Sequence, residues 1–215
     1  MASTLDRVEE SGSLVSRTDG STHHIFPVSV PFAEGRALRE RVVQESAGRT
    51  IEVGLGYGIS ALFICDGLLA AGNPDGRHVA IDPNQLTRFA GCGLQLLDDA
   101  GVCARVEHLA EESEIALPRL LAAGRRFDFA FVDGNHRFDG VFLDLVYLGR
   151  LLEPGSIVLV DDFQLPAVQA ATRFCVTNLG WSPEEASTED HDHHWAALRT
   201  SRSADRRPHD HFVSF

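Results

Sequence analysis

Hydrophobic and polar positions along this chain alternate between two kinds of pattern. Short apolar runs bounded by glycine or polar residues predict strands, whereas apolar positions three or four residues apart predict helices. The strands are expected at residues 50–54, 78–82, 104–109, 128–132 and 156–160, and the helices at residues 33–47, 59–71, 85–100, 113–123, 137–151 and 166–179. This regular alternation is typical of an α/β fold, in which helices cover both faces of a parallel sheet.

Both ends of the chain depart from this alternation. Residues 1–22 are rich in Ser, Thr, Asp and Glu with scattered apolar positions, so we expect a loosely docked N-terminal arm that reaches residue 32. Near the other end, residues 181–187 and 195–200 predict two more strands. The remainder, residues 33–215, has the size of a single domain, and no interdomain linker interrupts it.

Composition narrows the classes of function. The formal net charge of −12 disfavours nucleic acid as a partner, because binding to phosphate backbones needs clustered positive charge, and it favours a small neutral or cationic molecule. All 19 basic residues are arginine, which excludes a Walker A lysine, a pyridoxal-phosphate Schiff base and a serine–lysine dyad. The chain shows neither an apolar run of membrane-spanning length nor a secretory pattern at its start, so we expect no membrane partner and a cytoplasmic location.

The most informative stretch is Thr50–Ser60, an apolar strand that runs into glycines and then into a helix. Gly54, Gly56 and Gly58 allow a tight turn and the close approach of a ligand, which a Cβ atom would obstruct. We therefore expect a ligand above the carboxyl end of this strand, in contact with the three glycines and Tyr57. A tight turn without a ligand is the alternative.

The residues of this loop discriminate between two nucleoside cofactors. A dinucleotide-binding loop would have a glycine where this chain has Ile59. Glu52 stands two residues before the first glycine, where a carboxylate gains little beside a pyrophosphate but attracts the ammonium and sulfonium groups of S-adenosylmethionine. The loop therefore favours S-adenosylmethionine over NAD, with Glu52 and Ser60 among the expected contacts.

Further polar positions extend the expected cofactor site. Asp82 ends a strand 24 residues beyond Gly58, where nucleoside-binding α/β folds place a ribose-binding carboxylate, and capping of the next helix is the alternative. Glu112 and Ser113 follow the third strand at the same edge of the predicted sheet, where they could contact the adenine. Ser113 would also serve as a helix N-cap without any ligand.

In this order, the motifs resemble those of the class I S-adenosylmethionine-dependent methyltransferases. Within that family the chain resembles the small O-methyltransferases, both the metal-dependent catechol type and the cephalosporin and macrolide-sugar tailoring type. The resemblance covers about residues 30–200 and is carried by Glu52–Gly58, Asp82, Ser113–Pro118, Phe127–His136 and Leu151–Asp162. It implies a doubly wound, Rossmann-like sheet of seven strands with the last strand antiparallel, and transfer of a methyl group to a hydroxyl of a small molecule.

The resemblance also implies a metal-assisted site. In such enzymes an acid after the fourth strand and an acid pair after the fifth hold a divalent ion beside the transferable methyl, and the matching positions here are Asp133, Asp161 and Asp162. Carboxylates suit Mg²⁺ or Ca²⁺, although acids at strand ends also cap helices. Asp133 is thus expected to contact the cofactor and to act in catalysis. His136 could be a general base, a metal-adjacent ligand or a structural histidine.

Most of the ten histidines lie near the ends of the chain, and the C-terminus itself is apolar. The run Asp190–His194 contains metal-ligand types without the spacing of a defined site, and a solvated loop is the favoured interpretation. The histidine pair at residues 23–24 precedes the first helix and is a candidate substrate contact. Phe212, Val213 and Phe215 predict that the C-terminus docks on the domain or on a second copy of the chain in a homodimer.

Two alternative functions belong to other classes. An NAD(P)-linked oxidoreductase on a related fold is disfavoured by Ile59, by Glu52 and by the absence of a Tyr-x-x-x-Lys pair. A noncatalytic partner that keeps the fold is disfavoured by the intact glycine loop and Asp82. The identity of the methyl acceptor is left open.

Overall fold

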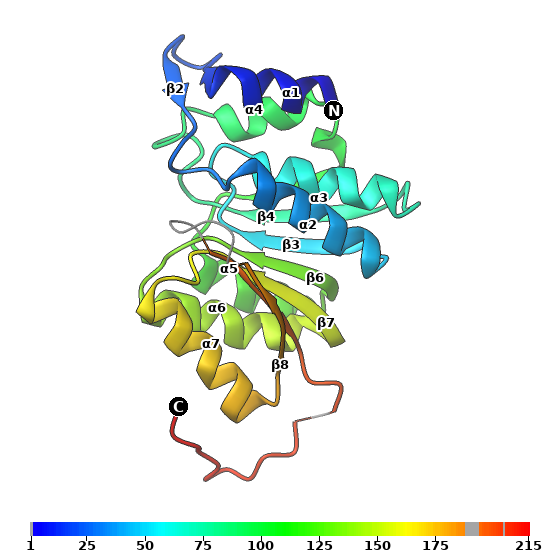
Figure 1. Cartoon of the computed structure of the whole chain (residues 1–215), viewed down its shortest axis with the longest axis vertical. Helices are drawn as coiled ribbons and strands as arrows, with labels where there is room; N and C mark the ends of the chain where they lie inside the picture. Colours follow the sequence, from blue (N-terminus) through cyan, green and yellow to red (C-terminus); the bar gives the residue numbers. More distant parts are fainter. Residues whose placement is uncertain (1, 188–193, 204) are drawn as a thin grey trace. The chain divides into compact units, whose positions relative to one another are not determined.

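The computed structural model describes residues 2–187, 194–203 and 205–215, and this part of the chain falls into two compact units (Figure 1). The first unit contains residues 1–112 and the second contains residues 113–215. The arm and single domain predicted from the sequence, with a boundary at residue 32, stay a prediction.

The first unit is built on parallel strands in the order β5-β4-β3. Its elements are α1 (Ala2–Ser11), β1 (Ser13–Val15), β2 (Thr22–His24), α2 (Phe32–Gln44), β3 (Arg49–Val53), α3 (Ile59–Ala70), β4 (Arg77–Ile81), α4 (Cys92–Asp99), a 3₁₀ turn (Cys103–Arg105) and β5 (Val106–Leu109). In β3 and in β4 every residue after the first is buried, as expected for strands covered on both faces. Among these buried residues, Glu52 and His78 are the ones with titratable side chains.

The second unit contains strands in the order β6-β7-β9-β8, in which β6 and β7 are parallel and β9 is antiparallel to both of its neighbours. Its elements are α5 (Ser113–Ala122), β6 (Phe127–Val132), α6 (Phe138–Leu151), β7 (Leu152–Val160), α7 (Pro166–Leu179), β8 (Ser182–Ala186) and β9 (Ala196–Arg199). Phe129 and Phe131 of β6 are completely buried, and burial of each stabilises the fold by roughly 1.5–3 kcal/mol.

The described residues therefore contain a main sheet of seven strands and seven α-helices. The last strand of the chain, β9, is antiparallel. The predicted α/β class, the number of strands in the sheet and the direction of the last strand are confirmed.

The helix predicted at residues 85–100 is shorter than expected, because only α4 is helical. The residues between β4 and α4 form turns instead. The Asp82 carboxylate accepts a hydrogen bond from the Asn84 amide at 2.7 Å, and Gly91 has a φ of 73°. Turn chemistry around Pro83 therefore outweighs the helical spacing of the apolar residues that follow.

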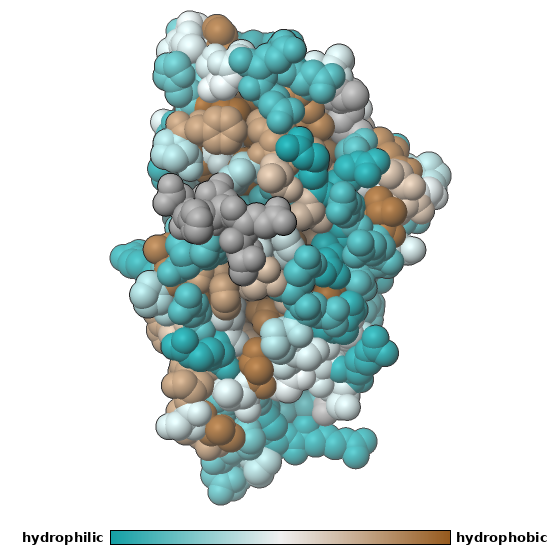
Figure 2. Space-filling view, in the orientation of Figure 1, coloured by the Kyte–Doolittle hydropathy of each residue, from teal (hydrophilic) through white to brown (hydrophobic). Residues whose placement is uncertain are grey.

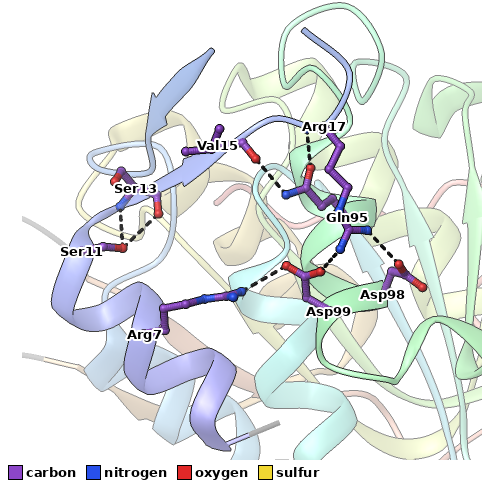
Figure 3. A network of polar contacts seen from close by, with 8 residues as sticks. All are labelled: Arg7, Ser11, Ser13, Val15, Arg17, Gln95, Asp98 and Asp99. Carbon is purple, nitrogen blue, oxygen red and sulfur yellow. Dashed lines mark hydrogen bonds and ion pairs between the residues drawn. The ribbon is translucent and has the colours of Figure 1, made fainter. Parts of the chain in front are cut away.

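The N-terminal segment, expected to dock loosely, forms α1 and the β1–β2 hairpin, and polar contacts fasten both to α4 (Figure 3). Arg7 pairs with Asp99 at 3.1 Å, and Arg17 pairs with Asp98 at 2.9 Å and also with Asp99. Gln95 accepts a hydrogen bond from the Arg17 amide at 2.7 Å and donates one to a carbonyl of β1 at 2.9 Å. These contacts join residues about eighty positions apart, which local composition does not reveal.

Hydrophilic residues cover most of the face seen in Figure 2, with hydrophobic residues scattered among them. In the described part of the chain, no helix has both the length and the apolar character that a membrane crossing requires. The four cysteines are free thiols, of which Cys103 is exposed and the other three are buried.

Candidate active site

The glycine loop of the first unit joins the carboxyl end of β3 to α3. Gly54, Gly56 and Gly58 have φ angles of 95°, 52° and 84°, a region that glycine enters without steric cost. A Cβ atom at Gly56 would meet no atom within 4 Å, whereas one at Gly58 would lie 2.9 Å from the carbonyl oxygen of Gly93 in α4. The loop therefore packs tightly on α4 and leaves open space on the side of Gly56 where a Cβ atom would stand.

Asp82 follows β4 and fastens this loop. Its Oδ2 atom accepts hydrogen bonds from the Gly56 amide at 2.8 Å and from Gln85 Nε2 at 3.0 Å, and its Oδ1 atom accepts one from the Asn84 amide at 2.7 Å. A carboxylate has about four lone-pair positions, so acceptor capacity remains for about one further donor. Asp82 is 4% exposed and closes the turn after β4, and its contact with a ribose stays a prediction.

Sequence reasoning misses two residues that complete the loop. Gln85 is buried, and its Nε2 atom also donates to the Gly56 carbonyl at 2.7 Å. A Cβ atom at Gly93 would lie 2.6 Å from that same carbonyl oxygen, so only glycine fits there. Gln85 stands three residues after Asp82 and could have been found from this spacing, whereas the need for Gly93 arises only from tertiary packing.

Glu52 turns its carboxylate into the protein. Its Oε2 atom accepts a hydrogen bond from the Ser60 hydroxyl at 2.8 Å, and its Oε1 atom lies 3.1 Å from His78 Nε2, poorly aligned for a hydrogen bond. Both Glu52 and His78 are completely buried, and His78 Nδ1 lies 2.9 Å from the Thr50 hydroxyl. Two predicted cofactor contacts, Glu52 and Ser60, therefore bind each other and link β3 to α3. Their direct contact with a cofactor stays a prediction.

Tyr57 forms the aromatic side of the loop. Its ring packs edge-on against Phe89 with centroids 5.1 Å apart, and lies 6.0 Å from the ring of His23 in β2. Burial raises the pKa of the Tyr57 hydroxyl. The N-terminal hairpin thus contacts the glycine loop through His23, whose Nε2 atom lies 2.8 Å from the Ser21 hydroxyl, whereas His24 is exposed.

In the second unit, acidic residues follow the carboxyl ends of the parallel strands β6 and β7. His136 lies between two of them, with Nε2 3.3 Å from Asp133 Oδ1 and Nδ1 2.9 Å from Asp162 Oδ2. Among the described residues, Asp133, His136 and Asp162 form the one group of potential metal ligands whose donor atoms lie within 4.8 Å of one another. We call these three residues the acid–histidine cluster.

Asp161 directly follows β7 and is not one of these three residues. Asp161 is 3% exposed, and its Oδ1 atom accepts a hydrogen bond from the Asp162 amide at 2.6 Å. Asp162 has a φ of 53°, a left-handed conformation that is uncommon outside glycine but more accessible to Asp than to most residues. Asp133 and Asp162 thus meet at His136, and the binding of a divalent ion by Asp133, Asp161 and Asp162 together stays a prediction.

The two carboxylates change the protonation of His136. Its hydrogen bond to Asp133 and then that to Asp162 raise the pKa of His136 to about 10, against the opposing effect of burial. The imidazole is therefore protonated at neutral pH and offsets one of the two negative charges of the acids. Because a protonated imidazole accepts no proton, His136 can act as a base only where another cation takes over the carboxylates. One imidazole nitrogen and two carboxylate oxygens also suit a divalent metal ion.

Glu112 and Ser113 are the predicted adenine contacts, and the boundary between the two units in the sequence falls between them. Glu112 is exposed at the end of the first unit, and Ser113 begins α5 in the second. Their contact with the adenine stays a prediction.

The buried carboxylate of Asp144 in α6 lies near the Ser113 hydroxyl, but neither of its oxygens is in hydrogen-bond geometry. Burial raises the pKa of Asp144 to about 6. An acid in an amphipathic helix suggests an exposed position, so sequence reasoning missed Asp144.

Most of the predicted solvated loop at Asp190–His194 lies outside the described residues. His194 is described, and two hydrogen bonds connect its backbone to the segment that follows Asp161 and Asp162. Its amide donates to Gln164 Oε1 at 2.9 Å, and its carbonyl accepts a hydrogen bond from the Phe163 amide at 2.7 Å.

Comparison with known proteins relates the chain to methyltransferases. A family model described as a methyltransferase domain matches residues 51–163. The caffeoyl-CoA O-methyltransferase of Populus kitakamiensis is 31% identical over 131 residues, which cover 58% of this chain and 53% of that protein. A putative caffeoyl-CoA O-methyltransferase of Arabidopsis thaliana is 29% identical over 139 residues, which cover 65% and 56%. The chain spans about half the length of the curated relatives it matches.

Solved structures share the fold. The O-methyltransferase TomG of Streptomyces achromogenes, involved in tomaymycin synthesis and solved with S-adenosylmethionine, has a TM-score of 0.66 and 26% identity, covering 81% of this chain and 82% of that chain. The O-methyltransferase of Bacillus cereus, solved with S-adenosylhomocysteine, has a TM-score of 0.71 and 19% identity, covering 92% and 91%. Because the family model matches more than half of its residues, this chain belongs to the methyltransferase domain family, with the fold of the class I S-adenosylmethionine-dependent methyltransferases.

Proposed function

We propose that this protein is an S-adenosylmethionine-dependent O-methyltransferase that acts on a hydroxyl group of a small molecule. The glycine loop carries the proposal, because the side of Gly56 where a Cβ atom would stand is open while Asp82 holds the loop and keeps acceptor capacity. The cofactor, when bound, supplies an electrophilic methyl group on a sulfonium. The TomG structure, solved with S-adenosylmethionine, supports this choice of cofactor.

The residues around the loop fit an adenosyl cofactor. A ribose offers hydroxyl donors, and Asp82 can accept from one of them while the Gly56 amide and Gln85 hold its carboxylate in place. A side chain at Gly56 would fill the space that the ligand needs. Tyr57, packed on Phe89, borders the loop with an apolar surface.

The other predicted contacts take supporting or separate parts in this proposal. Glu52 and Ser60 hold β3 and α3 together beneath the loop through their mutual hydrogen bond. Glu112 and Ser113 would contact the adenine. Alignment of the reacting groups and exclusion of water are the main contributions that the protein makes to a methyl transfer of this kind.

We also propose that the acid–histidine cluster removes the proton of the acceptor hydroxyl. A phenol has a pKa of about 10, so at neutral pH it needs help to become a nucleophile. His136 gains the capacity to accept that proton when Asp133 and Asp162 share their charge with another cation, for which Mg²⁺ is well suited. Such an ion, when bound, also lowers the pKa of a nearby hydroxyl.

A transfer assay with labelled S-adenosylmethionine and a panel of catechols and simple phenols tests both proposals. We expect a methylated hydroxyl and S-adenosylhomocysteine as products. Excess EDTA should abolish turnover, Mg²⁺ should restore it, and cofactor affinity should stay unchanged in EDTA. Asp162→Asn should reduce turnover by roughly ten- to a hundredfold, whereas Asp139→Asn, at an acid of α6 outside the cluster, should not. Full turnover in EDTA would contradict the metal, and methylation of amines alone would contradict O-methyl transfer.

A further inference from the structure

A cavity in the second unit lies at the opposite end of β7 from the acid–histidine cluster. It has a volume of about 530 Å³ and is bordered by the ends of α6 and α7, the start of β7 and the chain after β9. Pro154 lines it, whereas Asp162 follows the far end of the strand after Val160. At about 3.3 Å per residue the strand separates the two places by roughly 20 Å. Cavities of roughly 300–1,000 Å³ typically hold small organic ligands.

Positive charge gathers at this cavity, although the chain has a net charge of −12. Arg150, Arg206 and Arg207 line it with His211, and Asp205 is the one carboxylate among the lining residues. Arg207 is engaged with Asp205 through two hydrogen bonds of 2.6 and 2.8 Å, which hold the pKa of the Asp205 carboxyl well below its usual range. Within the described ranges, no carboxylate forms an ion pair with Arg150 or Arg206. The charge of Arg150 also acts on Asp205, so the three guanidinium groups at the cavity share one carboxylate and positive charge is in excess.

The remaining wall is apolar with hydroxyl groups. Trp181 is 5% exposed and packs against Gly149, where a Cβ atom would lie 2.9 Å from the indole. Val146 and Leu152 add aliphatic surface, and Ser201 adds a hydroxyl. Guanidinium groups match the oxygens of a phosphate group in geometry and charge, whereas an indole and aliphatic side chains pack against a ring or a carbon chain.

The C-terminal tail that forms part of this wall is fixed to the second unit. The buried side chain of Asn178 in α7 accepts a hydrogen bond from the Val213 amide at 2.7 Å and donates one to the Val213 carbonyl at 2.9 Å. Phe215 packs edge-on against Phe174 with centroids 5.2 Å apart, and Figure 1 shows the tail returning to α7. The expected docking of the C-terminus on its own domain is therefore present, and it holds the arginines of the tail in place before a ligand arrives.

We propose that this cavity binds a small phosphorylated organic molecule, in addition to the cofactor and acceptor of the proposed methyl transfer. Arg150 and Arg206 hold the phosphate dianion, and Trp181 with its aliphatic neighbours contacts the organic part. His211 and Ser201 are further donors to the phosphate.

Calorimetric titration of the full chain with phenyl phosphate tests this proposal. We expect saturable binding that the double variant Arg150→Gln, Arg206→Gln weakens at least tenfold. Arg173→Gln, at an exposed arginine of α7 outside the cavity, should leave the affinity unchanged. Saturation with S-adenosylhomocysteine should also leave it unchanged, so failure of the proposed methyl transfer and failure of this site are distinguishable. Phenol and inorganic phosphate should each bind at least tenfold more weakly, because each lacks one half of the recognised group.

Absence of phenyl phosphate binding would overturn the proposal, and so would an unchanged affinity in the double variant. Phenol bound as tightly as phenyl phosphate would overturn the phosphate recognition, and inorganic phosphate bound as tightly would overturn the role of Trp181. If the double variant melts at a lower temperature than the wild type, Arg206→Gln alone is the deciding variant. Arg206 lies in the exposed tail, and its replacement by Gln should weaken binding by at least threefold.

Discussion

The carboxylates at the strand ends of the two units are stabilised in different ways. In the first unit, Asp82 is 4% exposed and accepts hydrogen bonds from two backbone amides and one side-chain amide. In the second unit, the side chains of Asp133 and Asp162 are 18% and 17% exposed and share the imidazole of His136, and Asp162 also accepts one side-chain amide hydrogen bond, from Gln164 at 2.6 Å. Amide donors keep their hydrogens at every relevant pH, whereas an imidazolium can lose its proton or be replaced by a metal ion.

This difference matches the two tasks in the proposed reaction. A cofactor of constant structure needs an acceptor whose position and charge stay fixed, and the backbone around Asp82 provides it. Removal of a proton needs groups whose charge can change, and the acid–histidine cluster provides these. A carboxylate held by amide donors and a carboxylate held by a titratable imidazole should therefore respond differently to mutation and to pH.

The largest effect is expected at Asp82. Asp82→Ala removes three hydrogen bonds within the loop and the proposed ribose contact, so we expect S-adenosylmethionine to bind about 10- to 150-fold more weakly, equivalent to ~1.5–3 kcal/mol. Calorimetry measures this change. Asp75→Ala, at an exposed acid of the same unit, is the matched control and should bind like the wild type. An unchanged dissociation constant in Asp82→Ala would leave this residue with a structural role alone.

A smaller effect is expected at Asp144, which is as buried as Asp82 but has no donor in hydrogen-bond geometry. Burial raises its pKa to about 6, above an unfolded value of about 3.9. The folded state therefore binds more protons between these values, and the free energy of unfolding falls as pH rises from about 4 to 6. Asp144→Asn should remove this fall and be more stable than the wild type at pH 7 by on the order of 2 kcal/mol.

Urea denaturation at pH 4, 5, 6 and 7 measures this difference between Asp144→Asn and the wild type. Asp139→Asn, on the same helix, should keep the pH profile of the wild type. Parallel profiles for Asp144→Asn and the wild type would show that folding does not raise the pKa of Asp144.

The smallest effect is expected where carboxylates face water. Arg17 is 60% exposed and pairs with Asp98 and Asp99, so Arg17→Gln should cost only about 0.2–1 kcal/mol of stability, and less at high salt. Asp99→Asn should cost more than Asp98→Asn, because the side chain of Asp99 is 17% exposed and that of Asp98 is 63% exposed. Thermal unfolding at low and high salt checks both expectations. Equal costs for the two aspartates would contradict the link between burial and effect.

The first half of the candidate site follows from local sequence patterns. A strand that runs into Gly54, Gly56 and Gly58 predicts the loop, and the strand end at Asp82 predicts the acid beside it, because both features depend on residues close in sequence. The α/β class and the strand directions follow from the alternation of elements and from the family resemblance. Direct contact of these residues with a cofactor stays a prediction.

The second half depends on conformation and on distant partners. Asp162 has a left-handed φ and contacts His136, and no pattern of residue types shows either that angle or that contact. The docking of the N-terminal arm depends on pairs such as Arg17 with Asp98, far apart in the sequence. Sequence reasoning predicted the residue types of the acid–histidine cluster but not their pairing.

The central claim is that the glycine loop binds S-adenosylmethionine. Calorimetric titration of the purified chain with S-adenosylmethionine, S-adenosylhomocysteine and NAD⁺ tests it most directly. The account predicts dissociation constants on the order of micromolar for the first two ligands, equivalent to about −8 kcal/mol, and no measurable binding of NAD⁺. Binding of NAD⁺ without binding of S-adenosylmethionine would contradict the account and favour an oxidoreductase on a related fold.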